Sequence, residues 1–405
     1  MSKNHIKAWT RAFPKDLLTA RAENRVAWFE NRAVAHEMIN NVRSEVRRLI
    51  RGGRRHPITL VVGPTGIGKS TLIKLLKKEI TDEILPSLSH DPGRIPIASI
   101  EASSIEKGIF NWKDHYIKCL EVLRDVLILN KLEDDDCDIC RGKTYLSDNP
   151  RVSAPSFRHA LEHALVHRRP VAFFIDEAQH LTKMSSGRRL LDQMDIIKSI
   201  ANCTQIPHVL FGTYDLLALR NLNGQLSRRN FEVHFGRYRI DDKNHLAEFK
   251  KVLRSFENLL PVKEKPSLEV QWEFVYERSL GCVGILKDWL SRALEQAIDD
   301  GSPVIRSTHL QRSAMSITRC HTIAKEIIHG EERMAEDARA RPQLLSLLGL
   351  TVPAKTQVGA ERSTSTTEKD SQEQAPFPLT STTQKLRPFE QKPKRHTTDP
   401  KRRFA

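Results

Sequence analysis

The sequence has no apolar run long enough to cross a bilayer, and its first residues lack the apolar core of a signal peptide. It is also poor in cysteine, with six among 405 residues, scattered along the chain except for one close pair. Sparse cysteines of this kind suit reduced thiols rather than a disulfide framework. These absences exclude a membrane-spanning protein and a disulfide scaffold. They predict a cytoplasmic protein with no membrane partner.

The one close cysteine pair is an incomplete metal motif. Cys137 and Cys140 form a C-x-x-C within an acidic stretch, but no second C-x-x-C follows. The only nearby pair of histidines at helical spacing is His159 with His163. Zinc sites normally show two such ligand pairs in sequence. The pattern therefore favours an acidic surface loop with two free thiols, and we predict no zinc.

The charge balance is strongly basic, with a net charge of +15 and a pI near 9.6. A surplus of this size indicates an acidic polymer as partner, with nucleic acid as the first candidate and a membrane surface as the second.

The most specific motif is Gly-Pro-Thr-Gly-Ile-Gly-Lys-Ser-Thr at 63–71, which follows an apolar β-branched run and precedes an apolar run at helical spacing. A strand-to-helix turn is the context in which G-x-x-x-x-G-K-S forms a phosphate loop. The backbone N–H groups would face the phosphates, Lys69 would reach the β and γ oxygens, and Ser70 would offer its hydroxyl to Mg²⁺. The predicted ATP-binding residues are Gly63, Pro64, Thr65, Gly66, Ile67, Gly68, Lys69, Ser70 and Thr71.

Two carboxylates close a second apolar run, at 171–177. Asp176 is predicted to hold Mg²⁺ together with Ser70, and Glu177 to orient a water for attack on the γ-phosphate. Thr213, at the end of the next apolar run, is predicted to contact the γ-phosphate or that water. A local backbone hydrogen bond is the competing interpretation of this threonine.

Strand and helix patterns alternate over residues 56–240, which predicts an α/β fold with a doubly wound parallel sheet. A basic helical segment at 1–55 precedes this domain, and a helical lid domain at 241–338 follows it. Few apolar residues occur in the last part of the chain, so we expect a disordered basic tail at 339–405 that docks a partner. The remaining strands are expected at 58–62, 95–101, 207–213 and 231–235.

Three further residues are candidates for nucleotide chemistry. Arg228 and Arg229 lie between a helix and the fifth strand, where one of them would reach the γ-phosphate of a neighbouring subunit. The sequence does not distinguish between the two. Lys287 in the lid is a candidate for a second phosphate sensor.

Together these residues resemble an AAA+ ATPase of the ASCE phosphate-loop class, and the resemblance covers about residues 20–335. Within that class the chain is most similar to the transposon-encoded TnsC/TniB regulators, relatives of MuB. The resemblance implies an ATP-dependent homo-oligomer, a ring or helical filament, on double-stranded DNA. This oligomer would couple a target-selection protein to a transposase, with ATP hydrolysis driving disassembly. One departure is Lys287, where many AAA+ proteins have arginine. The motifs that carry the resemblance are residues 63–71, Asp176-Glu177-Ala178-Gln179-His180, Gly212-Thr213, Leu226-Ser227-Arg228-Arg229 and Phe235-Gly236-Arg237-Tyr238.

Basic residues of two segments are candidates for contacts with DNA phosphates. Both segments leave the sheet on the side that would face the axis of a ring or spiral. The candidates are Lys107, Lys113, Lys118, Lys183, Arg188 and Arg189.

Other function classes fit less well. Asn130-Lys131-Leu132-Glu133 imitates the guanine-reading motif of GTPases, but it has Glu where Asp is needed and precedes the acidic strand. A nucleotide kinase is disfavoured by Glu177 beside the metal ligand. A signalling switch that does not bind DNA would leave the charge unexplained. The alternative that shares both fold and DNA is a helicase-loader or replication-initiator ATPase.

Overall fold

The computed structural model describes residues 12–52, 57–103, 110–126, 128, 153–182, 188–219 and 230–349, with the backbone alone at 188–192, 230, 336–341 and 343. The chain divides into two compact units, residues 1–348 and 349–405. The structural description below concerns the first unit.

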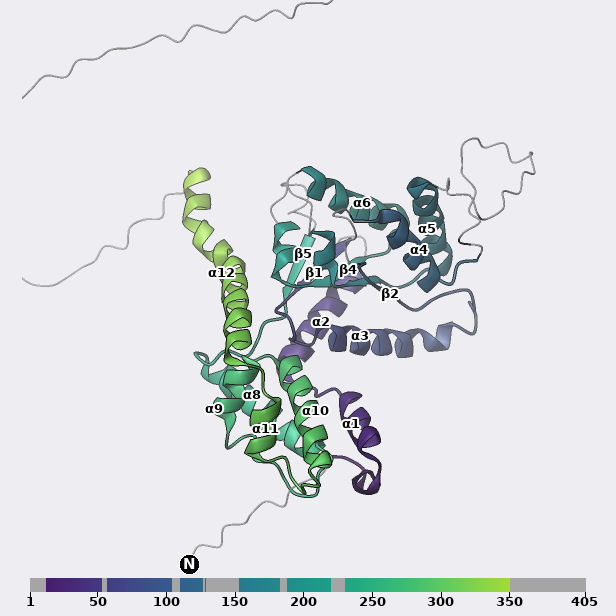
Figure 1. Ribbon diagram of the computed structural model, residues 1–405. Helices are drawn as coiled ribbons and strands as arrows, with labels where there is room; N and C mark the ends of the chain where they lie inside the picture. Colours follow the sequence, from purple (N-terminus) through teal and green to yellow (C-terminus); the bar gives the residue numbers. More distant parts are fainter. Residues whose placement is uncertain are drawn as a thin grey trace, which may run out of the picture. The chain divides into compact units, whose positions relative to one another are not determined.

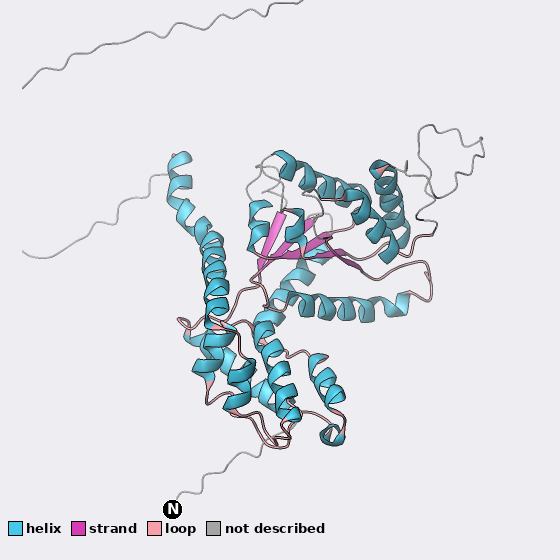
Figure 2. Cartoon of the chain, viewed as in Figure 1, coloured by secondary structure: helices cyan, strands magenta, loops and turns pink. Residues whose placement is uncertain are grey.

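A single parallel sheet organises this unit (Figures 1 and 2). Its spatial order is β2-β3-β4-β1-β5, and every neighbouring pair is parallel. This order confirms the predicted α/β parallel sheet, because the first strand lies between the fourth and the fifth. The strands are β1 (Ile58–Val62), β2 (Ala98–Glu101), β3 (Phe173–Asp176), β4 (His208–Gly212) and β5 (Asn230–His234).

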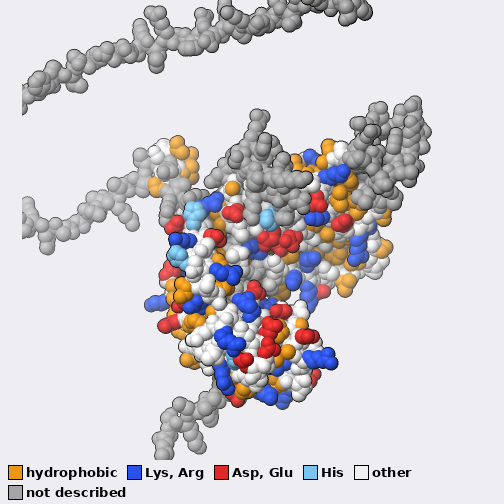
Figure 3. Space-filling model, in the orientation of Figure 1, with side chains coloured by type: hydrophobic (Ala, Val, Ile, Leu, Met, Phe, Trp, Pro, Cys, Tyr) orange, Lys and Arg blue, Asp and Glu red, His pale blue; other side chains and the backbone are white. Residues whose placement is uncertain are grey.

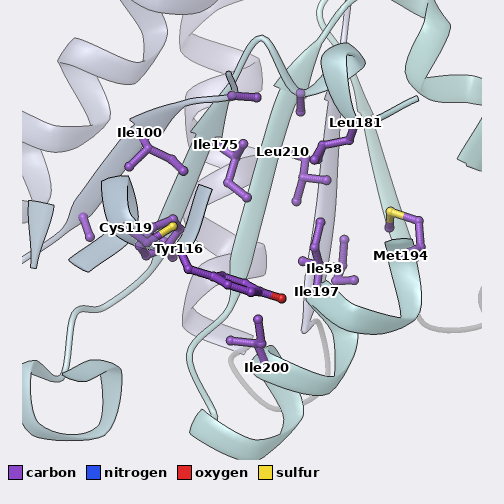
Figure 4. Packing of buried hydrophobic residues seen from close by; sticks show 14 of the residues in the cluster. Ile58, Ile100, Tyr116, Cys119, Ile175, Leu181, Met194, Ile197, Ile200 and Leu210 are labelled. Carbon is purple, nitrogen blue, oxygen red and sulfur yellow. The ribbon is translucent and has the colours of Figure 1, made fainter. Parts of the chain in front are cut away.

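Helices cover both faces of the sheet, so its strands are buried on both sides. Successive residues of a strand point to opposite faces. On β3, Phe173 and Ile175 join the apolar cluster under α4, α5 and α6, whereas Phe174 joins the cluster formed with α2 and α3. Figure 4 shows the first cluster, with Ile175 and Leu210 of the strands near Tyr116 of α4 and Ile197 of α6. The covering helices are α2 (Glu37–Gly52), α3 (Lys69–Ile84), α4 (Trp112–Val122), α5 (Ala154–Arg168) and α6 (Arg188–Thr204).

The helix after β2 is shorter than the sequence predicts. We expect it from Trp112 to about Leu129, but α4 ends at Val122. Arg124 then takes a left-handed conformation with φ of 53°. A left-handed residue just past the last turn is a common way for a helix to end, although its usual occupant is glycine.

The helical lid has its own core, to which the N-terminal helix α1 (Ala22–Glu30) belongs. Phe29 of α1 is 1% exposed, and its ring centroid lies 6.0 Å from that of Phe256. Helix α2, by contrast, packs on the sheet. The segment predicted as one unit at 1–55 is therefore divided between two cores. The other lid helices are α8 (Lys243–Leu259), α9 (Trp272–Ser279), α10 (Val283–Asp299) and α11 (Ser307–Ser313).

The last helix of the unit, α12 (Ile317–Leu347), passes through position 338, where the sequence places a domain boundary. It returns to the α/β domain, where Gly330 lies against the Tyr214 ring in η6 (Tyr214–Leu219). Arg237, just after β5, forms two hydrogen bonds with Glu331, of 2.9 and 3.2 Å. The helix therefore contacts the segment that directly follows Thr213.

In the part of the chain that the structure describes, no helix combines the length and the apolarity needed to span a bilayer.

Candidate functional site

The phosphate loop joins β1 directly to α3. Gly66 and Gly68 have φ of 68° and 111°, a region that side-chain-bearing residues rarely adopt. The N–H of Gly63 donates to the Gly212 carbonyl at 3.2 Å, which ties the loop to the end of β4. The predicted strand-loop-helix context is therefore present.

Lys69 is the first residue of α3 and is buried, with 6% of its surface exposed. Its Nζ donates to the carbonyl oxygens of Gly63, at 3.1 Å, and Pro64, at 2.9 Å. Burial lowers the pKa of Lys69, and the negative charges of Glu177 and Asp176 oppose that shift. The ammonium group thus lies inside the loop that would receive the phosphates.

Ser70 and Asp176 meet across the sheet edge, where the Ser70 hydroxyl donates to Asp176 Oδ2 at 3.0 Å. Burial raises the pKa of Asp176, and hydrogen bonds from the Glu177 N–H and from Ser70 act in the opposite direction. A hydroxyl and a carboxylate are oxygen ligands of the type that Mg²⁺ prefers. The two side chains therefore fit a Mg²⁺ ion, as the sequence predicts.

Glu177 follows the last residue of β3 in a left-handed conformation, with φ of 51°. Its N–H donates to Asp176 Oδ1 at 2.9 Å. Thr213 follows the neighbouring strand β4, and its hydroxyl donates to Asp215 Oδ2 at 3.2 Å. The competing interpretation of Thr213 is a local hydrogen bond to the backbone. The bond observed is local, but its acceptor is the Asp215 side chain. The contact with γ-phosphate stays a prediction.

The lid touches the phosphate loop through the start of α10. The Ile285 N–H donates to the Gly66 carbonyl at 2.8 Å. A Cβ at Gly284 would lie 2.4 Å from that carbonyl oxygen, so only glycine allows this approach. Lys287 Nζ donates to the Glu30 carbonyl at 2.5 Å, and burial lowers the pKa of this lysine. The candidate second sensor therefore has its partner in α1.

Two of the DNA candidates, Lys113 and Lys118, have described side chains with partners within the protein. Lys113 Nζ lies 5.5 Å from the centroid of the Phe157 ring. Lys118 Nζ lies 2.8 Å from Ser103 Oγ and 3.0 Å from Asp114. Arg188 and Arg189 begin α6 without described side chains. The predictions that lie outside the described residues concern Lys107, Lys183, Arg228, Arg229, Cys137 and Cys140.

The sequence did not identify Gln179 as a functional residue, yet its side chain bonds both to Glu177 and to the backbone of Thr213. Nor did it identify Asp215, which accepts from Thr213. Gln179 was part of a motif that carried the resemblance, but no spacing rule assigns it a partner 34 residues away. Among the described residues, no group of three or more His, Cys, Asp and Glu is arranged to hold a metal.

Residues 51–220 match the family model described as "AAA domain". With the sheet order, this match confirms the predicted AAA+ fold. A search of the curated proteins gave no match.

The chain is also similar to solved structures. One is Cdc6p from Pyrobaculum aerophilum, at 15% identity and a TM-score of 0.48, covering 71% of this chain and 69% of that one. Another is the Aeropyrum pernix ORC2 protein in ADPNP-ADP complexes, at 17% identity and a TM-score of 0.44, covering 68% of this chain and 68% of that one. A third is the Thermotoga maritima RuvB Holliday junction branch migration motor, at 15% identity and a TM-score of 0.35, covering 68% of this chain and 67% of that one.

Proposed function

We propose that this protein binds and hydrolyses ATP at the phosphate loop. The observation that carries the proposal is the meeting of Ser70 and Asp176 at 3.0 Å, with Glu177 next in the chain and Lys69 buried inside the loop. The family match over residues 51–220 supports the same chemistry.

Each residue has a distinct task in this proposal. Lys69 exchanges its carbonyl partners for β and γ oxygens, which carry full negative charge and bind an ammonium more strongly. Ser70 and Asp176 would hold Mg²⁺, which when bound neutralises charge on the phosphates. Glu177 accepts a hydrogen bond from the attacking water and orients it in line with the γ-phosphate.

Two substitutions test this proposal. Lys69→Ala should abolish nucleotide binding, because the buried cation is lost. Glu177→Gln should keep binding and lower the hydrolysis rate at least ~100-fold, the usual contribution of a positioned base. The measurements are titration with a fluorescent ATP analogue and steady-state phosphate release. Glu45→Gln, an exposed carboxylate of α2, is the control. Normal turnover by Glu177→Gln would remove Glu177 as the water-orienting group.

We further propose that ATP drives assembly of this protein on double-stranded DNA and that the assembly regulates transposition. In this role it couples a target-selection protein to a transposase, and hydrolysis disassembles the oligomer. The net charge of +15 and the motifs shared with the TnsC/TniB regulators support this. On the face shown in Figure 3, Lys and Arg are interspersed with Asp and Glu. The net charge of +15 is therefore a property of the whole chain rather than of this face.

In this assembly either Arg228 or Arg229 would reach the γ-phosphate of the neighbouring subunit. The basic residues that would face the DNA are Lys107, Lys113, Lys118, Lys183, Arg188 and Arg189. For Lys118 this requires release from Ser103 and Asp114, its partners in the isolated chain.

A further inference from the structure

The side chain of Gln179 connects the ends of two neighbouring strands. Its Nε2 donates to Oε2 of Glu177, and its Oε1 accepts from the Thr213 N–H at 3.2 Å. Only one orientation of the amide satisfies both contacts, because a carboxylate can only accept and an N–H can only donate. Gln179 is 5% exposed, so water does not compete freely for either bond.

The surroundings are built to admit this side chain. A Cβ on Gly212, the last residue of β4, would lie 2.6 Å from Gln179 Oε1. Glycine at this position therefore leaves the room that the amide occupies. The main chain of Gln179 is also fixed, since its carbonyl accepts from the Thr182 N–H at 3.0 Å and from the Thr182 hydroxyl at 2.8 Å.

Glu177 needs such a restraint. It has a left-handed backbone, which is unfavourable for a residue with a side chain. The hydrogen bond from its own N–H to Asp176 fixes its main chain but not its carboxylate. Within the described part of the chain, Gln179 donates a hydrogen bond to the Glu177 carboxylate.

We propose that Gln179 is a positioning residue for ATP hydrolysis. It holds the Glu177 carboxylate in place and fixes it to the backbone of Thr213, so that the water-orienting group and the strand end beside the γ-phosphate move together. This inference rests on the proposed function of Glu177. It differs from a purely packing role for Gln179, which would affect stability without acting through Glu177.

Two substitutions at Gln179 separate these roles. Gln179→Leu removes both hydrogen bonds and replaces the amide with an apolar side chain of similar size. Gln179→Glu keeps the shape and an acceptor for the Thr213 N–H, but places a second carboxylate against Glu177. Both should lower kcat about tenfold or more, while the affinity for a fluorescent ADP analogue stays within about twofold. Gln311→Leu, an exposed glutamine of the lid, should match the wild type.

A double-mutant cycle gives the readout that packing alone would not move. In the Glu177→Gln background, Gln179→Leu should change single-turnover hydrolysis by less than about twofold, because the group it positions is already lost. Equal fold-losses in both backgrounds would overturn the proposal. A wild-type kcat in Gln179→Leu would also overturn it. If the leucine variant does not fold, a wild-type kcat in Gln179→Glu would do so instead. If Glu177→Gln itself hydrolyses ATP normally, the proposed function of Glu177 fails first, and the positioning role fails with it.

Discussion

Burial controls the ionisation of two histidines, His115 in α4 and His208 at the start of β4. It lowers the pKa of His115 and of His208 to about 4 each, and the nearby His208 adds to the shift of His115. Both residues are buried, and His115 Nδ1 has no hydrogen-bond partner among the described residues. Between about pH 6.5 and pH 4 the unfolded chain binds protons that the folded protein does not. The free energy of unfolding therefore falls as the pH drops through this window.

We predict that His115→Phe flattens this dependence. The phenyl ring keeps the apolar packing and removes one titrating group, which should retain on the order of 2 to 3 kcal/mol of the stability otherwise lost by pH 4. Urea unfolding from pH 7 to pH 4 measures the effect. A wild-type slope in His115→Phe would contradict the prediction.

The residues proposed to bind and hydrolyse ATP could be located from the sequence because each belongs to a short contiguous pattern. Lys69 and Ser70 follow glycines in one loop, and Asp176 and Glu177 close one apolar strand. Gln179 and Gly284 could not be predicted, because their importance comes from distant partners. The partner of Gln179 is Thr213, and the close approach of Gly284 is to Gly66. Local patterns do not encode such pairs.

Strands were predictable at the level of elements because burial on both faces makes them continuously apolar. Strand β1 matches its expected bounds, 58–62, and β4 lies within the expected 207–213. Helix α1 was harder, since its amphipathic pattern does not say which core receives it. Phe29 packs against Phe256, a residue of α8 that lies more than half the chain away.

The contact between α10 and the phosphate loop should affect nucleotide binding. Gly284→Ala places a Cβ against the Gly66 carbonyl oxygen, where the separation would be 2.4 Å unless the loop or the lid moves. The displaced loop should bind nucleotide about tenfold more weakly, a cost of roughly 1.4 kcal/mol.

The matched control is Gly93→Ala, because a Cβ there would have its nearest neighbour at 3.8 Å. Circular dichroism first shows that each variant is folded. Titration with the fluorescent ATP analogue then compares the nucleotide affinity of Gly284→Ala with that of Gly93→Ala. Unchanged affinity in Gly284→Ala would show that the lid contact does not shape the loop.

For the whole molecule, the proposed role requires a segment that recruits a partner. Residues 352–405 contain eleven Lys and Arg against six Asp and Glu, with Phe and Pro between them. We predict that deleting 352–405 leaves ATPase activity and DNA-dependent oligomerisation near the wild-type level, because the site lies in residues 63–213. Capture of a transposase, the partner that the proposed role requires, should be lost in a pull-down.

A protein whose residues 352–405 are shuffled controls for charge and length alone. It should also fail to capture the transposase if the order of residues matters. Capture that survives the deletion would place recruitment elsewhere. Loading of a replicative helicase by the full-length protein, with no transposase bound, would favour the helicase-loader or replication-initiator function instead.

Helix α12 also has a mechanical consequence. From Gly330, where it lies against Tyr214, to its end at Leu347 the helix spans roughly 25 Å, at about 1.5 Å per residue. A tilt of about 5° at that fulcrum would sweep the far end through roughly 2 Å. Tyr214 is the residue after Thr213, so in a rigid helix a small shift at the end of β4 would become a larger displacement at Leu347. The bidentate Arg237–Glu331 pair, next to Gly330 in the chain, ties the helix to the segment after β5 and would limit such a tilt.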